Sequence, residues 1–251
     1  MKKISIVIAA YRAQHWLDDC IRSVFSQLLP EGWQMQVLLG IDGCPSTLAC
    51  AQQLKHENLT VISLKENRGT YITFNTLMRL AEGDLICRFD ADDVMLENFL
   101  LAQIEALESG ADMSMTWSIY TDINLHATSY VIAHEVYHPK NGLNCRASEG
   151  QFIIHRHVWQ QLGGFRAWHC GADTDFFRRF RCFGFRYQTI KQHLYLRRTH
   201  PESLTAHPYS NFQSPLRLKI QKLTREYGEL YQSGKQNLKI DAEYDNNYER
   251  L

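Results

Sequence analysis

Three carboxylates follow directly after a short apolar run. The run is 85–89, and the acids are Asp90, Asp92 and Asp93. A run of this length predicts a buried strand, and open α/β sheets bind ligands at the carboxyl ends of their strands. The spacing Asp-x-Asp suits Mg²⁺ or Mn²⁺, which takes one or two protein carboxylates and leaves its other positions for water and phosphates. The sequence therefore predicts a metal-bound nucleotide diphosphate here. The alternative is that Asp92 or Asp93 only caps a helix starting near Val94.

Polar side chains also follow the other predicted strands of the first half. Tyr11 follows the first strand, Asp42 the second, and the turn 67–69 the third. Because carboxyl ends of parallel strands meet at one edge, we expect these residues to lie beside the acidic turn. Tyr11 can pack against a base, Asp42 can accept from a base N–H, and Arg68 can pair with phosphate. Each also has a simpler explanation: Tyr11 as a core residue, Asp42-Gly43 as a turn, and 67–69 as a helix entry.

The elements that must position these residues alternate regularly. Apolar runs predict strands at 4–10, 36–41, 61–64 and 85–89, and three- to four-residue spacing predicts helices at 13–28, 46–56 and 71–81. This alternation predicts an α/β fold with a doubly wound, mostly parallel sheet and right-handed crossovers.

The second half has a looser pattern. It predicts helices at 96–107, 157–162 and 174–182, and strands at 111–119, 151–154, 185–190 and 194–198, whereas 120–150 show no clear periodicity. A basic amphipathic helix at 216–231 is followed by a polar, Asn-rich stretch. We expect that stretch to fray at its end.

Composition excludes several classes of protein. The formal net charge is +0, so no global field attracts nucleic acid, and we expect no nucleic-acid partner. No apolar run approaches the ~18 residues needed to span a bilayer, and the N-terminus has no cleavable signal pattern. The seven cysteines are scattered and lack a Cys-x-x-Cys pair. They indicate free thiols in a reducing compartment, and the cytoplasm is the expected location.

Four segments stand in the order and approximate spacing of a family 2 glycosyltransferase with the GT-A fold. They are Ile4 to Tyr11, Ile41 to Ser46, Asn67-Arg68-Gly69 and Asp90-Ala91-Asp92-Asp93. The resemblance covers residues 3–95. It implies a GT-A type sheet flanked by helices, with a helical C-terminal tail. It also implies transfer of a sugar from a nucleotide donor, with inversion at the anomeric carbon and Mn²⁺ or Mg²⁺ held by the Asp-x-Asp motif.

The same resemblance assigns roles within the acidic turn. It implies that Asp92 is the direct metal ligand and that Asp90 contacts the ribose or the donor sugar. It implies that Asp93 either contacts the donor sugar or stabilises the turn without touching the donor or the metal. The other donor-binding positions that it implies are Ala10, Tyr11, Asp42, Asn67, Arg68, Gly69 and Ala91.

The second half continues the resemblance. Gly163-Gly164-Phe165 and then Gly171 to Phe176 look like the family segment that bears the catalytic base, and Asp173 matches the base itself. This base takes the proton of the acceptor hydroxyl. Ala172 stands where the family usually has glutamate, so Asp175 remains an alternative base. Asp173 can also cap the helix that begins at Thr174.

A third segment, Arg198 to Thr205, resembles the family region where a histidine or arginine approaches the metal and the diphosphate. The resemblance implies that His200 is a further metal ligand through its imidazole, and that Arg198 neutralises the departing diphosphate. Two departures accompany it: Ile41-Asp42 replaces the double aspartate that is frequent in the family, and no Gln-x-x-Arg-Trp motif is present. The second departure argues against a processive synthase.

Together these observations predict a single domain over 1–212, with a nucleotide-binding half (1–95), an acceptor and catalytic half (96–212), and a helical and polar tail (213–251). The predicted activity is inverting transfer from a nucleotide-diphosphate donor, such as a UDP-sugar, to a hydroxyl of a glycan or lipid-linked acceptor in bacterial surface polysaccharide synthesis. The C-terminal helix could contact the inner face of a membrane, dock onto the protein's own core, or bind a second subunit.

Two other functions compete with this one. A non-catalytic nucleotide-sugar-binding subunit is compatible with Ala172 and Ile41. A sugar-nucleotide pyrophosphorylase should carry a glycine-rich loop after the first strand, where this chain has Ala9-Ala10-Tyr11-Arg12.

Overall fold

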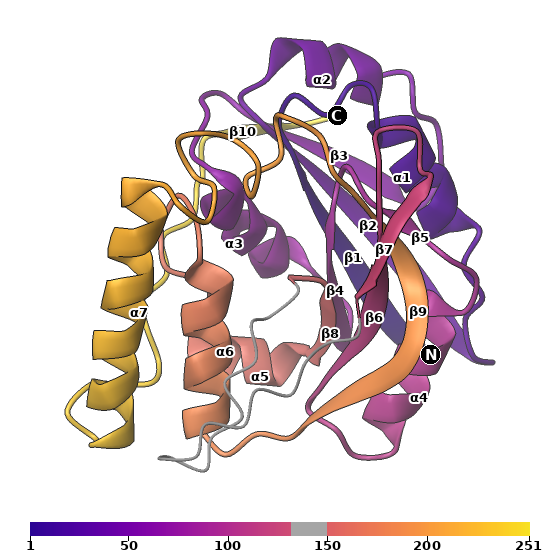
Figure 1. The fold of residues 1–251 in the computed structure, drawn as a ribbon. Coiled ribbons are helices and arrows are strands. Elements are labelled where there is room, and N and C mark those ends of the chain that lie inside the picture. Colours follow the sequence, from indigo (N-terminus) through magenta and orange to yellow (C-terminus); the bar gives the residue numbers. More distant parts are fainter. Residues whose placement is uncertain (132–149) are drawn as a thin grey trace.

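The computed structural model describes residues 1–131 and 150–251. These residues form a mixed sheet of ten strands with helices on both faces (Figure 1). The strands are β1 (Lys2–Ala10), β2 (Trp33–Asp42), β3 (Leu59–Leu64), β4 (Leu85–Asp90), β5 (Val94–Met95), β6 (Met113–Thr121), β7 (Ala127–Val131), β8 (Phe152–His155), β9 (Tyr187–Arg198) and β10 (Tyr248–Arg250). The helices are α1 (Leu17–Phe25), α2 (Pro45–Ala51), α3 (Thr70–Leu80), α4 (Phe99–Glu108), α5 (Arg156–Leu162), α6 (Ala172–Cys182) and α7 (Pro215–Gln232).

The first half forms the predicted parallel sheet. Its strands are ordered β3-β2-β1-β4, and every neighbouring pair is parallel. Side chains of β1 alternate between the two faces, as the pleat requires. Ile4, Ile6 and Ile8 pack into the core that includes residues of α1 and α4, whereas Val7 packs into a second core with residues of α3, α5 and α6. Each face of β1 is therefore covered.

The second half makes the sheet mixed. β8 lies antiparallel to β4 and β6, and β9 lies parallel to β6. The two strands predicted at 185–190 and 194–198 are one strand, β9, whose register against β6 shifts around Trp117. The alternative of a helix starting near Val94 is wrong: Val94 and Met95 form β5 against β9, and α4, predicted at 96–107, begins at Phe99. Long-range strand pairing overrides the local pattern at both places.

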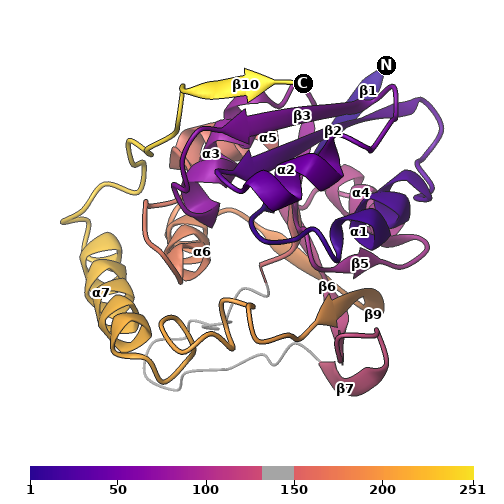
Figure 2. The same cartoon turned by 90° about the horizontal axis from the view of Figure 1, so that it is seen from above.

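The helix α7 docks onto the protein's own body. Ser214 caps it by accepting a hydrogen bond from the Arg217 N–H, and its buried side includes Ile220, Thr224 and Tyr231. It packs against α6, as Figures 1 and 2 both show. No helix in the described ranges is both long enough and apolar enough to cross a membrane.

The expectation that the C-terminus frays is wrong. β10 pairs antiparallel with β3, with Tyr248 opposite Leu64 and Arg250 opposite Ile62 (Figure 2). Without β10, the outer side of β3 would be a sheet edge with unpaired backbone groups, and edges of this kind are commonly covered. The tail therefore closes one side of the sheet.

Candidate active site

The predicted donor residues converge at the carboxyl edge of the parallel strands. Ala10 ends β1, Asp42 ends β2 and Asp90 ends β4. In the strand register Ala9 lies opposite Asp90 and Ala10 lies opposite Ile41, so these strand ends are direct neighbours. Ala10 and the adjacent Ala91 are almost fully buried. This edge carries the acidic turn.

Two of the three acids are held by protein donors. The Asp90 carboxylate accepts hydrogen bonds from Arg88 Nη2 (2.9 Å) and Gln151 Nε2 (2.9 Å). Gln151 Nε2 also donates to Asp93 Oδ2 (2.6 Å), and the Arg198 N–H donates to Asp93 Oδ1 (3.0 Å). Sequence reasoning missed Arg88 and Gln151. A charged residue inside the apolar run 85–89 was the available signal for Arg88, whereas nothing in the sequence marked Gln151.

The acidic turn is electrostatically crowded. Burial raises the pKa of Asp93 well above its ordinary value, and the charges of Asp92 and Asp90 raise it further. Burial also raises the pKa of Asp90. Arg88 opposes that shift, while the charges of Asp92 and Asp173 add to it. A cation at this turn would relieve the repulsion between like charges.

Asp92 is the acid whose carboxylate is turned toward His200. Its Oδ2 lies 3.0 Å from His200 Nε2, and 27% of the Asp92 side chain is exposed. The His200 ring packs against Trp16 with 5.2 Å between centroids. Within the described residues, no three His, Cys, Asp or Glu side chains are arranged to hold a metal alone. The pair fits a Mg²⁺ or Mn²⁺ ion that takes its remaining ligands from a diphosphate and water.

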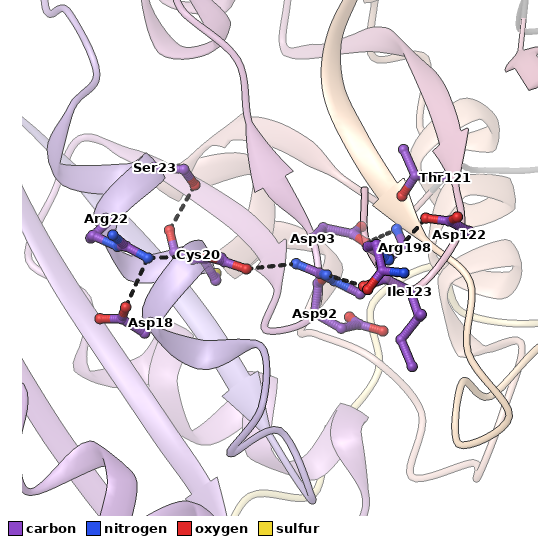
Figure 3. Close-up of polar contacts among 12 residues, drawn as sticks. Asp18, Cys20, Arg22, Ser23, Asp92, Asp93, Thr121, Asp122, Ile123 and Arg198 are labelled. Carbon is purple, nitrogen blue, oxygen red and sulfur yellow. Dashed lines mark hydrogen bonds and ion pairs between the residues drawn. The ribbon is translucent and has the colours of Figure 1, made fainter. Parts of the chain in front are cut away.

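Arg198 binds the backbone of the acidic turn. Its guanidinium is buried and donates to the carbonyls of Asp92 (3.0 Å) and Ile123 (2.5 Å) and to Asp19 Oδ2 (3.0 Å). Figure 3 shows Arg198 between Ile123 and the turn that carries Asp92 and Asp93. Each of its three side-chain nitrogens thus has a protein acceptor, so in this arrangement Arg198 fixes the position of the turn.

Asp42 organises the loop after β3. Its Oδ1 accepts from the Arg68 N–H (2.7 Å) and its Oδ2 from the Gly69 N–H (2.9 Å). Burial raises the pKa of Asp42, and these two hydrogen bonds oppose the shift. Gly43 is required because its φ is +61° and a Cβ there would lie 2.3 Å from Asn67 N. The helix-entry explanation of this loop is correct, and it brings the exposed Asn67 and Arg68 to the donor edge.

Tyr11 and Arg68, which follow β1 and β3, have different neighbours. Tyr11 is 46% exposed, so the simpler explanation of it as a core residue is wrong. The Arg12 guanidinium lies 5.3 Å from its ring and pairs with Glu202 (3.1 Å). The Arg68 side chain instead contacts a carboxylate of the C-terminal tail, Glu243.

The two candidate bases have different environments. Asp173 lies in the first turn of α6, is half-buried, and accepts from the Thr174 N–H (2.8 Å). Its charge contributes to the raised pKa of Asp90, after burial and the charge of Asp92.

Asp175 belongs to a buried network between α6 and α7. It is fully buried, and its carboxylate accepts from Arg179 Nε (2.8 Å) and Tyr231 OH (2.8 Å), with Arg166 Nε 3.3 Å away. Arg179 also donates to the Gly164 carbonyl (2.7 Å). This network joins the two helices.

Comparison with known proteins places the chain in a family. Residues 5–194 match the family described as glycosyl transferase family 2. The chain is 28% identical over 106 residues to the putative teichuronic acid biosynthesis glycosyltransferase TuaG of Bacillus subtilis, a match that spans 41% of this chain and 40% of TuaG. It is 22% identical over 205 residues to the putative glycosyltransferase EpsE of the same organism, covering 77% of this chain and 72% of EpsE.

Solved structures share the fold. S. aureus TarS 1–349 in complex with UDP-GlcNAc superposes with a TM-score of 0.70 at 14% identity, covering 93% of this chain and 71% of TarS 1–349. The mannosyltransferase PcManGT from Pyrobaculum calidifontis, in complex with GDP-Man and Mn²⁺, superposes with a TM-score of 0.63 at 15% identity, covering 90% and 70%. These likenesses confirm the predicted GT-A type fold. With a family match that spans most of its length, the chain belongs to glycosyl transferase family 2.

Proposed function

We propose that the chain is a metal-dependent, inverting glycosyltransferase that moves a sugar from a UDP-sugar to a hydroxyl of a glycan or lipid-linked acceptor. One observation carries the proposal. Asp92, in the acidic turn at the carboxyl edge of the parallel strands, has its Oδ2 3.0 Å from His200 Nε2, although the two residues are 108 positions apart. This pair can hold a divalent cation against a donor diphosphate, and the half-buried Asp173 is the carboxylate that we propose as the base.

The donor half is residues 1–95. Tyr11 packs against the base, Asp42 accepts from a base N–H, and Asp90 contacts the ribose or the sugar. The loop 67–69 borders the donor, and its Arg68 pairs with the diphosphate. The backbone at Ala10 and Ala91 borders the same edge. Asp93 supports the turn through Gln151.

Asp92 and His200 would hold the metal ion. When bound, Mn²⁺ or Mg²⁺ neutralises charge on the departing diphosphate. Asp173 takes the proton of the acceptor hydroxyl as the hydroxyl oxygen bonds to the anomeric carbon on the face opposite the diphosphate. The bond from that carbon to the diphosphate oxygen breaks in the same displacement, so the anomeric configuration inverts.

The relatives support the choice of substrates. TarS is bound to UDP-GlcNAc, TuaG is named for teichuronic acid biosynthesis, and PcManGT is bound to GDP-Man and Mn²⁺. These names favour bacterial surface polysaccharide synthesis as the setting of the reaction. We further propose, from the sequence, a cytoplasmic location, with 96–212 as the acceptor and catalytic half and 213–251 as the tail.

A peripheral contact with an anionic membrane is the second part of the proposal. Residues 203–225 contain four Lys or Arg residues and no Asp or Glu. The same stretch exposes Leu204, Tyr209, Phe212 and Leu218. A basic surface with exposed aromatic rings suits a membrane interface. Vesicle co-sedimentation with phosphatidylglycerol tests it: Phe212→Ser should lose binding and Phe183→Ser, on another exposed ring, should keep it. Equal, negligible binding by all forms would remove the membrane contact.

A screen of UDP- and GDP-sugars tests the activity itself. Nucleotide release that requires Mn²⁺ or Mg²⁺ and increases with added acceptor supports the proposal. Tight, metal-dependent UDP binding with neither hydrolysis nor transfer would instead indicate a nucleotide-sugar-binding subunit. Such a role would agree with Ala172 in place of the family glutamate.

A further inference from the structure

The C-terminal tail returns to the donor edge after α7. It is fixed there by backbone groups: the Ile240 N–H donates to the Leu162 carbonyl (3.1 Å), Asn75 Nδ2 donates to the Glu243 carbonyl (2.8 Å), and the Asp245 N–H donates to Thr76 Oγ1 (2.9 Å). β10 then pairs with β3. These contacts set the course of the tail without the Glu243 carboxylate. The Asp245 carboxylate does take part, because its Oδ1 accepts from the Asn247 N–H (2.7 Å).

Two of those acidic side chains meet Arg68. Glu243 Oε1 accepts from Arg68 Nη2 at 2.5 Å, and Asp245 Oδ2 lies 3.7 Å from Arg68 Nη1. Glu243 is half-exposed, whereas 9% of the Asp245 side chain is exposed. Two carboxylates on one guanidinium present the same chemistry as two oxygens of a diphosphate, because both are anionic acceptors for paired N–H donors.

The backbone of Arg68 belongs to the donor edge, although its side chain contacts the tail. Its N–H is bound by Asp42 at the end of β2. The Arg68 side chain is 36% exposed, so it remains partly open to solvent while the tail carboxylates neutralise it.

We infer that the C-terminal tail is an internal competitor for the donor: Glu243, supported by Asp245, occupies Arg68 until a donor diphosphate displaces it. The inference rests on the proposed donor role of Arg68. An exposed ion pair changes an equilibrium constant by up to about fivefold. The contact between Arg68 and Glu243 therefore weakens donor binding by up to that factor and does not prevent it. Since the backbone holds the tail, releasing the side chain requires no unfolding of β10.

The test uses the full chain and measures binding of UDP with Mn²⁺ by titration calorimetry, with inorganic pyrophosphate as a probe that lacks the base. Glu243→Gln should tighten both ligands by about two- to fivefold. Glu66→Gln is the matched control, because it removes one negative charge two residues before Arg68 in the same loop. It should change affinity less than Glu243→Gln does.

A double-mutant cycle decides whether the effect passes through Arg68. Arg68→Gln should weaken UDP binding, and Glu243→Gln should then have no further effect in that background. If Arg68→Gln weakens binding while Glu243→Gln leaves it unchanged or weakens it, the internal competitor is refuted and the donor role of Arg68 stands. If Arg68→Gln has no effect, or the wild type binds neither ligand, the donor role of Arg68 and this inference both fail.

Discussion

Replacing the carboxylate by an amide should have different effects at the two candidate bases. Asp173→Asn and Asp175→Asn each replace a carboxylate by an amide of nearly the same shape. Asp175 is fully buried with Arg179, which is also fully buried, whereas Asp173 is half-buried at the start of α6. We expect Asp175→Asn to lower stability and Asp173→Asn to lower turnover.

The magnitude for Asp175→Asn follows from the charge that it leaves behind. Arg179 Nε loses its carboxylate partner at 2.8 Å, and Arg166 loses one at 3.3 Å. Removing one partner of a buried ion pair costs about 3–5 kcal/mol. In a chain of this size each kcal/mol lowers Tm by about 2–4 °C, so the expected decrease is roughly 6–20 °C.

Asp173→Asn should leave the fold nearly unchanged. Asp173 lies in the first turn of α6 and does not cap it. Asparagine there removes one negative charge from the helix N-terminus, which costs about 0.3–1 kcal/mol of stability. Loss of a general base lowers kcat by about 10²–10⁴-fold. Donor binding should persist, because Asp173 lies outside the donor half.

Thermal denaturation by circular dichroism and steady-state turnover with the preferred donor separate the two effects. Both variants are measured beside wild type, and UDP affinity serves as the check that the donor site is intact. The reasoning fails if Asp175→Asn keeps the wild-type Tm but loses turnover while Asp173→Asn remains active. That pattern would move the base two residues along α6.

Three further predictions concern the metal, the tail and the loop after β2. Asp92→Asn should lose most transfer activity and keep its Tm, and chelator should inactivate wild type until Mn²⁺ is restored; full activity in excess chelator would refute metal dependence. Gly163 and Gly234 both have positive φ, so an alanine at either position should cost roughly 1–2 kcal/mol of stability. A Cβ at Gly163 would also lie 1.9 Å from the Ile240 carbonyl oxygen, whereas a Cβ at Gly234 would meet no atom. Gly163→Ala should therefore destabilise the fold more than Gly234→Ala does. Equal losses in urea denaturation would mean that the tail does not require this glycine. Burial opposes ionisation of the Cys44 thiol, but hydrogen bonds outweigh burial and lower the pKa of this thiol to about 7. The alkylation rate of Cys44 should therefore rise as the pH increases through about 7, and it should fall when UDP is bound. An inflection near pH 9 would contradict this prediction.

Local sequence pattern determined the first half of the fold. The strands that end at Ala10, Asp42, Leu64 and Asp90 are β-branched or apolar runs, and each is separated from the next by a helix. Pleat and helix periodicity are properties of a few consecutive residues, so they can be recognised in the sequence alone. The parallel order then brings the acidic turn and the loop 67–69 to one edge, which is why their shared position could be predicted before any contact was known.

Contacts between distant segments decided the rest. Arg68 and Glu243 are 175 positions apart, and Asp92 and His200 are 108 apart. β10 forms because β3 offers an edge, and Val94 joins β9 because the chain returns beside it. Nothing in the residues around Asp175 shows that Tyr231 and Arg166 will bury it. The counter-ion of a charged group and the partner of an edge strand are set by which surfaces meet on folding. These assignments therefore required the tertiary structure.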